Sequence, residues 1–349
     1  MKLDNIEGLS RAGDVRISDL AAELGLTKGT VSRALNGYED ISKKTRQRVM
    51  EAAKKRGYVP STQARRLAKG LTETIGMVLP PMPSQRGNTF VSEFITSVST
   101  TLHVHGYDLL VHSGSVDESE VEPYRRLVQS RKVDGFVVFR TMEHDPRVEY
   151  LLEEGFPFVT HGRTARMEEH DWFDIDGEKA FRQATSHLIG LGHQQIGLVG
   201  GGKGFYSAQL RAKGFQKMME ESGLEIAPSM ETQGNLTGRG GEEAAHELLK
   251  TPPRPTAILC ANDATALGVI KAAMELGFQI PNQLSVIGYD GIALGGYLQP
   301  PLTTLTFSIE ESGKEVVELL LRRLKDPGLP FISRLASATL KLRGSEGPK

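Results

Sequence analysis

The stretch RISDLAAELGLTKGTVSRALNG, residues 16–37, predicts two short helices joined by a tight turn. The first follows the cap candidate Ser18 and ends at Gly25, because glycine readily adopts the left-handed conformation that terminates a helix. The second follows Thr27, whose side chain can cap the free backbone amides of the first turn. Apolar residues at helical spacing give each helix an inward face, made of Leu20, Ala21, Leu24, Val31, Ala34 and Leu35. Helix, short turn and helix together form the helix-turn-helix pattern.

A third helix is expected over Lys43–Arg56, after the cap candidate Ser42. In a helix-turn-helix the first residues of the second helix reach base edges in the major groove of DNA. In this chain those residues are Thr27, Lys28, Gly29, Thr30, Ser32 and Arg33. Arg33 can read a guanine with two hydrogen bonds, and the Ser and Thr hydroxyls suit bases or phosphates.

Gly29 stands in the first turn of the second helix, where glycine costs roughly 1 kcal/mol relative to alanine. One interpretation is that a missing side chain lets the helix backbone approach the bases closely. The other is that Gly29 is a neutral, exposed position. The sequence leaves both open.

Charge is divided unevenly along the chain. Residues 1–70 carry 15 Lys+Arg and 8 Asp+Glu, while residues 71–349 carry 27 and 35, within a total net charge of −1. A basic head on an acidic body is expected when only the head meets DNA phosphates. A solvated basic surface without a partner would give the same count.

The motif TVSRALNG, followed by I-S, T-R, A-A, G-Y-x-P and A-R-x-L, resembles the DNA-binding head and hinge of the LacI/GalR family of bacterial repressors. The resemblance covers nearly the whole chain after the first dozen residues. It implies a homodimer on a palindromic operator, with further DNA contacts at Asn36, Ser42, Thr45, Ala64 and Leu67. It also implies a hinge helix at STQARRLAKG, whose Leu67 wedges into the minor groove. From the residues alone, this segment could equally be an ordinary linker helix.

From Thr74 onward, strand-like and helix-like segments alternate, which predicts an α/β body with parallel sheets. Strands are expected at 74–80, 108–113, 135–139, 157–162, 195–201, 256–260 and 284–290. Helices are expected at 90–106, 123–133, 147–155, 181–192, 207–223 and 263–277.

Residues 75–78 and 196–199 resemble each other, which suggests two similar lobes with a cleft between them. The resemblance implies a body like the periplasmic binding proteins. The expected domains are an all-α helix-turn-helix head over 1–60, a hinge over 61–72 and a body over 73–343. Within the body, one lobe spans 73–173, with 303–343 exchanging at the crossover, and the other spans 174–302.

Polar residues at strand ends are candidates for the cleft, because ligands of open α/β sheets bind at the carboxyl ends of strands. Arg211, Asn262, Asp263 and Asp290 offer an arginine fork, an amide and two carboxylates, which suit a hydroxyl-rich ligand. By resemblance, R-x-x-G-F, A-N-D and G-Y-D are the sugar-contacting positions of the family. An alternative for Asp263 is a helix cap.

Four further residues are effector-binding candidates. Trp172, the single tryptophan, offers a flat surface to a sugar ring, with lobe packing as the alternative. Phe90, His161 and Arg163 are candidates from the first lobe. The family often has an aspartate directly before this arginine, whereas this chain has Gly162, which puts the hydroxyl contacts on that side in doubt.

Other chemistry finds little support. The run GLVGGGK, residues 197–203, fits part of a P-loop, but Gly204 stands where Ser or Thr must hold Mg²⁺. His103 and His105 have the wrong spacing for one face of a helix, and Cys260 reads as a small core residue. We therefore expect no cofactor, metal or catalytic residue.

The sequence thus predicts a dimeric, cytoplasmic repressor whose operator affinity depends on a small sugar-like effector, possible examples being α-glucoside-type disaccharides. The effector could act as inducer or as corepressor. A sugar-binding carrier is the alternative from another class, but it would require a signal peptide and no basic head, and neither holds for this sequence. A sugar-processing enzyme would require paired catalytic carboxylates in the cleft.

Overall fold

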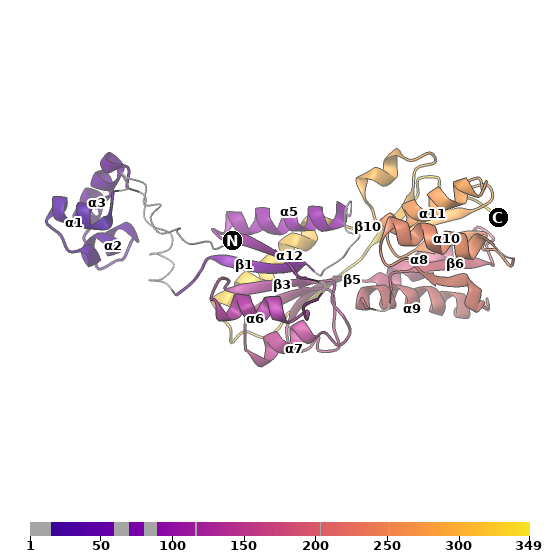
Figure 1. The fold of residues 1–349 in the computed structure, drawn as a ribbon, viewed down its shortest axis with the longest axis horizontal. Helices are drawn as coiled ribbons and strands as arrows, with labels where there is room; N and C mark the ends of the chain where they lie inside the picture. The colour runs from indigo at the N-terminus through magenta and orange to yellow at the C-terminus, as the bar shows by residue number, and fades with distance from the viewer. Residues whose placement is uncertain (1–14, 59–69, 80–88, 116, 203, 251) are drawn as a thin grey trace, which may run out of the picture. The chain divides into compact units, whose positions relative to one another are not determined.

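The structure, a computed structural model, describes residues 15–58, 70–79, 89–115, 117–202, 204–250 and 252–349. The chain divides into two compact units, Met1–Thr72 and Glu73–Lys349 (Figure 1). We call the first unit the head and the second the body. Among the described residues, no helix combines the length and the apolar character needed to cross a bilayer.

The head contains the three predicted helices, α1 (Ile17–Leu24), α2 (Lys28–Leu35) and α3 (Lys43–Arg56). The prediction that Ser18 caps α1 is wrong, because the helix begins at Ile17 and Arg16 is in the cap position, two residues earlier. The carboxylate of Asp19 accepts the backbone N–H of Arg16 at 2.8 Å and closes the first turn instead.

The other helix ends of the head follow the predicted chemistry. Gly25 ends α1 with a φ of 64°. Thr27 caps α2, and Ser42 caps α3 by accepting a backbone N–H with its hydroxyl. One apolar face of each helix forms the small core of the head: Leu20, Ala21, Val31, Ala34, Val49, Ala52 and Ala53.

The body contains two six-stranded sheets, which form two lobes. The first sheet has the order β11-β5-β4-β3-β1-β2 and the second has the order β12-β10-β9-β8-β6-β7. The strands of the first sheet are β1 (Thr74–Leu79), β2 (Asp108–Ser113), β3 (Gly135–Phe139), β4 (Phe158–His161), β5 (Asp171–Ile175) and β11 (Ser333–Ala336). Those of the second are β6 (Ile196–Gly200), β7 (Glu231–Gln233), β8 (Ala257–Cys260), β9 (Ser285–Asp290), β10 (Thr303–Thr306) and β12 (Thr339–Lys341). The pairing is parallel, as predicted, except that β12 runs antiparallel to β10.

Helices cover both faces of each sheet (Figure 1). In the first lobe, α5 and α12 pack on one face and α6 and α7 on the other; in the second, α8 and α9 lie opposite α10 and α11. The helices are α5 (Thr89–Val104), α6 (Glu122–Gln129), α7 (Pro146–Glu153), α8 (Gly177–Gly190), α9 (Tyr206–Glu221), α10 (Gly238–Lys250), α11 (Asp263–Glu275) and α12 (Ile309–Lys325). Two short 3-10 helices span Pro228–Met230 and Ala293–Tyr297.

The chain passes between the lobes three times. It leaves the first sheet after β5, returns between β10 and α12, and crosses again between β11 and β12. The stretch 303–343 is therefore shared, because α12 and β11 belong to the first lobe while β10 and β12 complete the second sheet.

Candidate functional site

The N-terminal turn of α2 is exposed on the head. Thr27 accepts the backbone N–H of Thr30 at 3.1 Å, and the two hydroxyls lie 2.9 Å apart. Lys28 and Gly29 are both exposed beside them. The side chains predicted to reach DNA at the start of this helix are therefore accessible.

Packing within the head does not require a glycine at position 29. A Cβ added to Gly29 would have one neighbour within 4 Å, the Thr27 hydroxyl at 3.8 Å. The helix could therefore carry a larger residue without a clash inside the head. Both interpretations of Gly29 therefore remain: it allows the helix backbone to approach DNA closely, or it is a neutral, exposed position.

Arg33 lies on the exposed side of α2 and is held by neighbours within the head. Its Nη2 atom lies 2.5 Å from the carboxylate of Asp40, and its guanidinium lies 5.5 Å from the ring centre of Tyr38. The side chain is 53% exposed, so solvent screens the ion pair and weakens it. Arg33 can therefore exchange Asp40 for a base at small cost.

The remaining predicted DNA contacts divide into two groups. Asn36 donates from Nδ2 to the carbonyl of Ser32 at 2.9 Å and caps the C-terminal end of α2. The Ser42 hydroxyl accepts the N–H of Thr45 at 3.2 Å. The Thr45 hydroxyl lies 2.9 Å from that of Ser42, so all three side chains have contacts within the head. Ala64 and Leu67, with most of the predicted hinge, lie outside the described residues.

A cavity lies between the strand ends of the two lobes of the body. Its free volume is about 70 Å³, and side chains from both sheets line it. The structure brings five of the predicted effector residues to this cavity: Phe90, His161, Arg211, Asn262 and Asp290. Arg163, Trp172 and Asp263 do not line it.

Arg211 is buried at the start of α9 and is fixed by neutral acceptors. It donates to the carbonyl of Ala261 at 2.6 Å and to the hydroxyl and carbonyl of Ser207, both at 3.1 Å. Its guanidinium also lies 4.4 Å from the ring centre of Tyr289. The charged plane is thus held rigidly at the cavity wall.

Asn262, and not Asp263, has the helix-cap role that the sequence suggested as an alternative for Asp263. Asn262 is the N-cap of α11, because its Oδ1 accepts the N–H of Thr265 at 2.9 Å, while the residue still lines the cavity. Asp263 is fully buried and accepts from the Thr304 hydroxyl at 2.6 Å and from the Ile292 N–H at 2.8 Å. Burial raises the pKa of Asp263 to about 6, although these hydrogen bonds oppose the shift. Asp263 therefore braces the loop after β9.

Asp290 ends β9 with a φ of 114°, a conformation that residues with side chains rarely adopt. Its carboxyl group is buried, and burial raises its pKa well above the usual range. Repulsion from Asp263 adds to this shift, while Arg211 and Arg140 oppose it. Asp290 is thus a desolvated acid at the cavity wall, suited to a hydrogen bond with a ligand hydroxyl.

His161 and Phe90 form the aromatic side of the cavity in the first lobe. The His161 ring packs 4.7 Å from the ring of Phe94 and 6.1 Å from that of Phe90. Burial lowers the pKa of His161, which keeps the imidazole neutral. Its buried Nε2 has no hydrogen-bond partner among the described residues, so it is available to a ligand hydroxyl.

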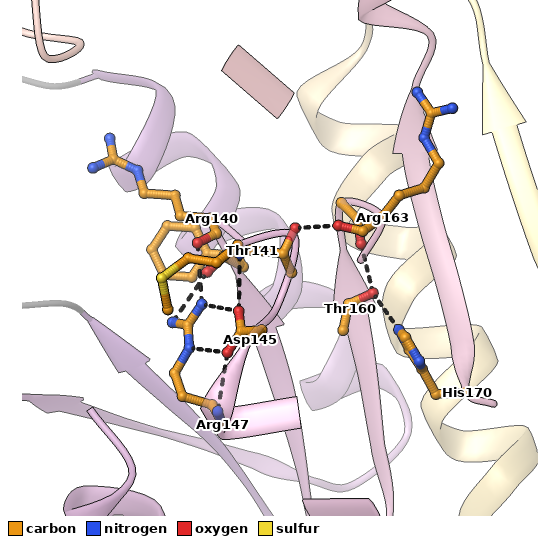
Figure 2. Close-up of polar contacts among 10 residues, drawn as sticks. Arg140, Thr141, Asp145, Arg147, Thr160, Arg163 and His170 are labelled. Atoms are coloured by element: carbon orange, nitrogen blue, oxygen red, sulfur yellow. Dashed lines mark hydrogen bonds and ion pairs between the residues drawn. The ribbon is translucent and has the colours of Figure 1, made fainter. Parts of the chain in front are cut away.

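Arg163 acts beside the cavity. Its Nε donates to Asp174, a cavity residue, at 2.8 Å. Its carbonyl accepts the Thr141 hydroxyl at 2.8 Å, as Figure 2 shows. The preceding Gly162 has a φ of 114°, and a Cβ there would lie 2.5 Å from the Thr141 hydroxyl. This backbone therefore has no room for the aspartate that the family often carries before the arginine.

Trp172 lies on β5, away from the cavity. Its side chain is buried, and Nε1 donates to the carbonyl of Met167 at 2.8 Å. Neighbouring residues of a strand point to opposite faces, and Phe173 points into the core that α5 and α12 cover. The structure therefore gives the indole the role of lobe packing, the alternative considered above.

Sequence reasoning missed several residues of the cavity. Arg140 and Asp174 add charged groups from the first lobe. Aromatic and apolar walls come from Phe139, Phe205, Leu236, Tyr289 and Phe307. Arg140 directly follows β3, so the strand-end rule that identified Asp290 would also have identified it.

Among the described residues, one group of three side chains could offer ligand atoms to a metal. Atoms of Glu242, His246 and Glu275 lie within 4.8 Å of one another on the outer face of α10 and α11. The ammonium of Lys271 already lies 2.7 Å from Glu242 and 3.5 Å from Glu275. These carboxylates therefore have a counter-ion of their own.

Comparison with known proteins agrees with both units. Residues 16–61 match the model of bacterial regulatory proteins of the lacI family. Residues 185–346 match a periplasmic binding protein-like domain.

Several relatives match almost the whole chain. The HTH-type transcriptional regulator AglR of Rhizobium meliloti (strain 1021) is 33% identical over 96% of this chain and 95% of its own length. The ribose operon repressor of Escherichia coli (strain K12) is 31% identical over 94% and 99%. A lac repressor dimer bound to operator and an anti-inducer is 26% identical, with a TM-score of 0.82 over 95% and 99%. The chain belongs to the lacI family of bacterial regulatory proteins and is a DNA-binding transcriptional regulator, not an enzyme.

Proposed function

We propose that the chain acts as a homodimeric repressor whose affinity for a palindromic operator is controlled by a sugar bound between the lobes of the body. The proposal that the ligand is a sugar rests on one observation, which is the composition of the cavity wall. Arg211, Asn262, Asp290 and His161 offer hydrogen bonds of several kinds, while aromatic rings offer flat apolar surfaces. Hydroxyls and C–H faces of a sugar match these two kinds of surface.

The DNA half of the proposal relies on the head. The start of its second helix presents Thr27, Lys28, Gly29 and Arg33 as exposed residues, and the head carries the basic excess of the chain. We further propose that residues 61–72 form a hinge helix in the operator complex, with Leu67 as its minor-groove wedge. Two-fold symmetry of the dimer then requires a palindromic site.

The coupling between sugar and DNA requires a ligand that prefers one of two arrangements of the lobes. The two lobes meet at the cavity, where the backbone N–H of Tyr206 donates to the carbonyl of Thr141 at 2.9 Å. A sugar that contacts both lobes beside this bond would favour one lobe arrangement. We propose that this preference is transmitted to the hinge and changes operator affinity.

We propose an α-glucoside-type disaccharide as the effector. A sugar of this size receives support from a solved family member described as a CelR–cellobiose complex, which is 27% identical with a TM-score of 0.71. Its match covers 95% of this chain and 99% of that one. Both inducer and corepressor action are compatible with this proposal.

The test uses the full-length chain in two steps. Selection from a random DNA library yields the preferred site, and fluorescence anisotropy then measures its affinity against random DNA at matched salt. Titration of the bound complex with α- and β-linked disaccharides shows whether the sugar lowers operator affinity, as an inducer does, or raises it. Equal affinity for random DNA would remove the repressor proposal, and no response to any sugar would remove the effector proposal.

A further inference from the structure

Backbone strain in the body concentrates at the effector cavity. Among the described residues, six that are not glycine have a positive φ. Three of these line the cavity, namely Arg140 at 54°, Leu236 at 57° and Asp290 at 114°. Such conformations persist only where the surroundings enforce them, and they cluster at ligand clamps. Of the three, Arg140 alone comes from the first lobe.

The backbone of Arg140 is fixed from two sides. Arg147 donates from Nη2 to the Arg140 carbonyl at 3.0 Å, and its guanidinium is itself held by Asp145 at 2.7 Å. Both side chains of this ion pair, which Figure 2 shows, are almost fully buried according to their exposed fractions of 5% and 0%. The next residue, Thr141, accepts the N–H of Tyr206 from the second lobe. A buried ion pair and a contact between the lobes thus hold the strained residue in place.

The side chain of Arg140 extends away from this ion pair, as Figure 2 shows. Its guanidinium lies 5.6 Å from the ring centre of Phe205, which belongs to the second lobe. Burial lowers the pKa of Arg140 to about 10, with Arg211 adding to the shift and Asp290 opposing it. A guanidinium with this pKa is charged at neutral pH. The first lobe thus places a cation at the cavity, within electrostatic reach of two cavity residues of the second lobe.

We propose that Arg140 is a specificity-determining residue, which donates hydrogen bonds from the first lobe to neighbouring oxygens of the effector, opposite Asp290. The planar guanidinium presents its N–H donors as a fork, which fits two adjacent oxygens of one sugar ring. A ligand held by both residues links the lobes at the point where they meet. This inference rests on the proposed sugar-regulated function and adds to it the residue that selects the sugar.

The chain provides a matched control for the strained arginine. Arg131 has a φ of 48°, close to that of Arg140, but it is exposed in the turn before β3 and does not line the cavity. Glycine adopts a positive φ without strain, so Arg131→Gly and Arg140→Gly relieve the same conformation. Only Arg140→Gly also removes a side chain that lines the cavity.

The experiment measures sugar binding to the full-length chain by calorimetry, with maltose, sucrose, trehalose and cellobiose as probes. Arg140→Gly is expected to weaken binding of the best sugar by about tenfold to a hundredfold, which is the value of hydrogen bonds from a charged donor. Arg131→Gly should remain within about twofold of the wild type, as for an ordinary surface change. Arg140→Lys keeps the charge but loses the fork, so its affinity should fall between those of Arg140→Gly and the wild type.

Monodeoxy analogues of the best sugar give a second readout, which a general loss of structure would not reproduce. For either analogue that lacks one of the two contacted hydroxyls, Arg140→Gly should cause a smaller loss of affinity than it causes for the intact sugar. If Arg140→Gly binds the best sugar as tightly as the wild type does, this inference is wrong. It is also wrong if Arg140→Gly causes the same loss of affinity for every analogue. Either result leaves the proposed function standing. A wild-type chain that binds no sugar would overturn the proposed function and this inference together.

Discussion

Arg33 and Asp40 form an ion pair on the surface of the head, with 2.5 Å between the guanidinium Nη2 and a carboxylate oxygen. The residue predicted to read a base is therefore already oriented by a partner from its own unit. Both side chains are about half exposed, so the pair adds little stability and is easily exchanged. The carboxylate thus orients the guanidinium in the free protein through a pair that is easily broken.

Arg33→Ala should weaken binding to the selected operator by about 1–3 kcal/mol if Arg33 reads a base. Binding to random DNA should fall much less, since only the base contact is specific. Fluorescence anisotropy at several salt concentrations measures both values. Asp40→Asn serves as the comparison, because it removes the internal partner and leaves Arg33 in place. Equal losses on operator and random DNA would make Arg33 a phosphate contact.

Gly29→Gln should leave the head folded, since the position is exposed and a Cβ there has one neighbour within 4 Å, at 3.8 Å. Helix propensity should improve by up to about 1 kcal/mol, because glycine is the less favourable residue in a helix. If the helix backbone approaches the bases closely, a selection from randomised operators should return a different base opposite position 29. The same preferred site as for the wild type would favour the neutral, exposed interpretation.

Arg211→Ala should weaken effector binding by about 1–3 kcal/mol, because it removes a charged donor and leaves the buried Ala261 carbonyl without its partner. Operator binding should persist while the response to sugar is lost. Calorimetry with the best sugar measures the first effect and anisotropy the second. Arg182→Ala is the control, since that arginine pairs with Glu221 on the surface of the second lobe. A sugar affinity unchanged by Arg211→Ala would place the sugar elsewhere.

Trp172→Phe should keep the sugar affinity of the wild type, because the indole is buried away from the cavity. Stability should fall by about 1 kcal/mol with the loss of the hydrogen bond from Nε1 to the Met167 carbonyl. Calorimetry and urea unfolding separate the two effects. A tenfold loss of sugar affinity would instead support the earlier interpretation that Trp172 offers a flat surface to a sugar ring.

Stability should depend on pH through His170, whose ring lies between the Arg166 carbonyl at 3.0 Å and the Thr160 hydroxyl at 3.1 Å. Burial lowers the pKa of His170 from 6.5 to about 4. Between pH 6.5 and pH 4 the unfolded chain therefore takes up a proton that the folded chain does not, so the free energy of unfolding decreases as pH falls. At about 1.4 kcal/mol per pH unit, the loss approaches about 3 kcal/mol.

The buried Asp263 acts in the opposite sense, since its pKa is raised to about 6 and the folded chain takes up a proton first. Urea unfolding of the wild type and of His170→Gln, followed from pH 7 to pH 4, isolates the histidine as the difference between the two curves. Parallel curves would show that His170 titrates alike in both states.

The head could be predicted closely because its local chemistry decides its structure. Thr27, Ser42 and Gly25 are residue types that favour helix ends by themselves, and they stand at helix ends in the structure. Ser18 is the exception. The carboxylate of Asp19 caps the backbone of Arg16 and moves the start of the helix.

The cavity could be predicted only in part. The rule that strand ends carry ligand residues identified Asn262 and Asp290, because it depends on topology alone, while Arg211 was identified at the start of a helix. It could not place Trp172, since the side-chain direction of a residue within a strand depends on the pairing register. Nor could sequence show the backbone strain of Arg140, which results from a buried ion pair and from the second lobe. Helices α10 and α12 were not assigned in advance.

The return of the chain to the first lobe has a consequence for synthesis. Helix α12 covers one face of the first sheet, where the Ser97 hydroxyl donates to the Glu310 carbonyl at 2.7 Å and Gly313 allows the two helices to approach. The ribosome makes α12 only after nearly all of the second lobe. Until then β3, β4 and β5 lack the helix that covers them on this face, and the side of α5 that carries Phe94 and Val98 has no helix packed beside it. The first lobe to be translated is therefore finished only after nearly all of the second lobe, and a chain cut short after β10 would keep five strands of each sheet but expose the core of the first lobe.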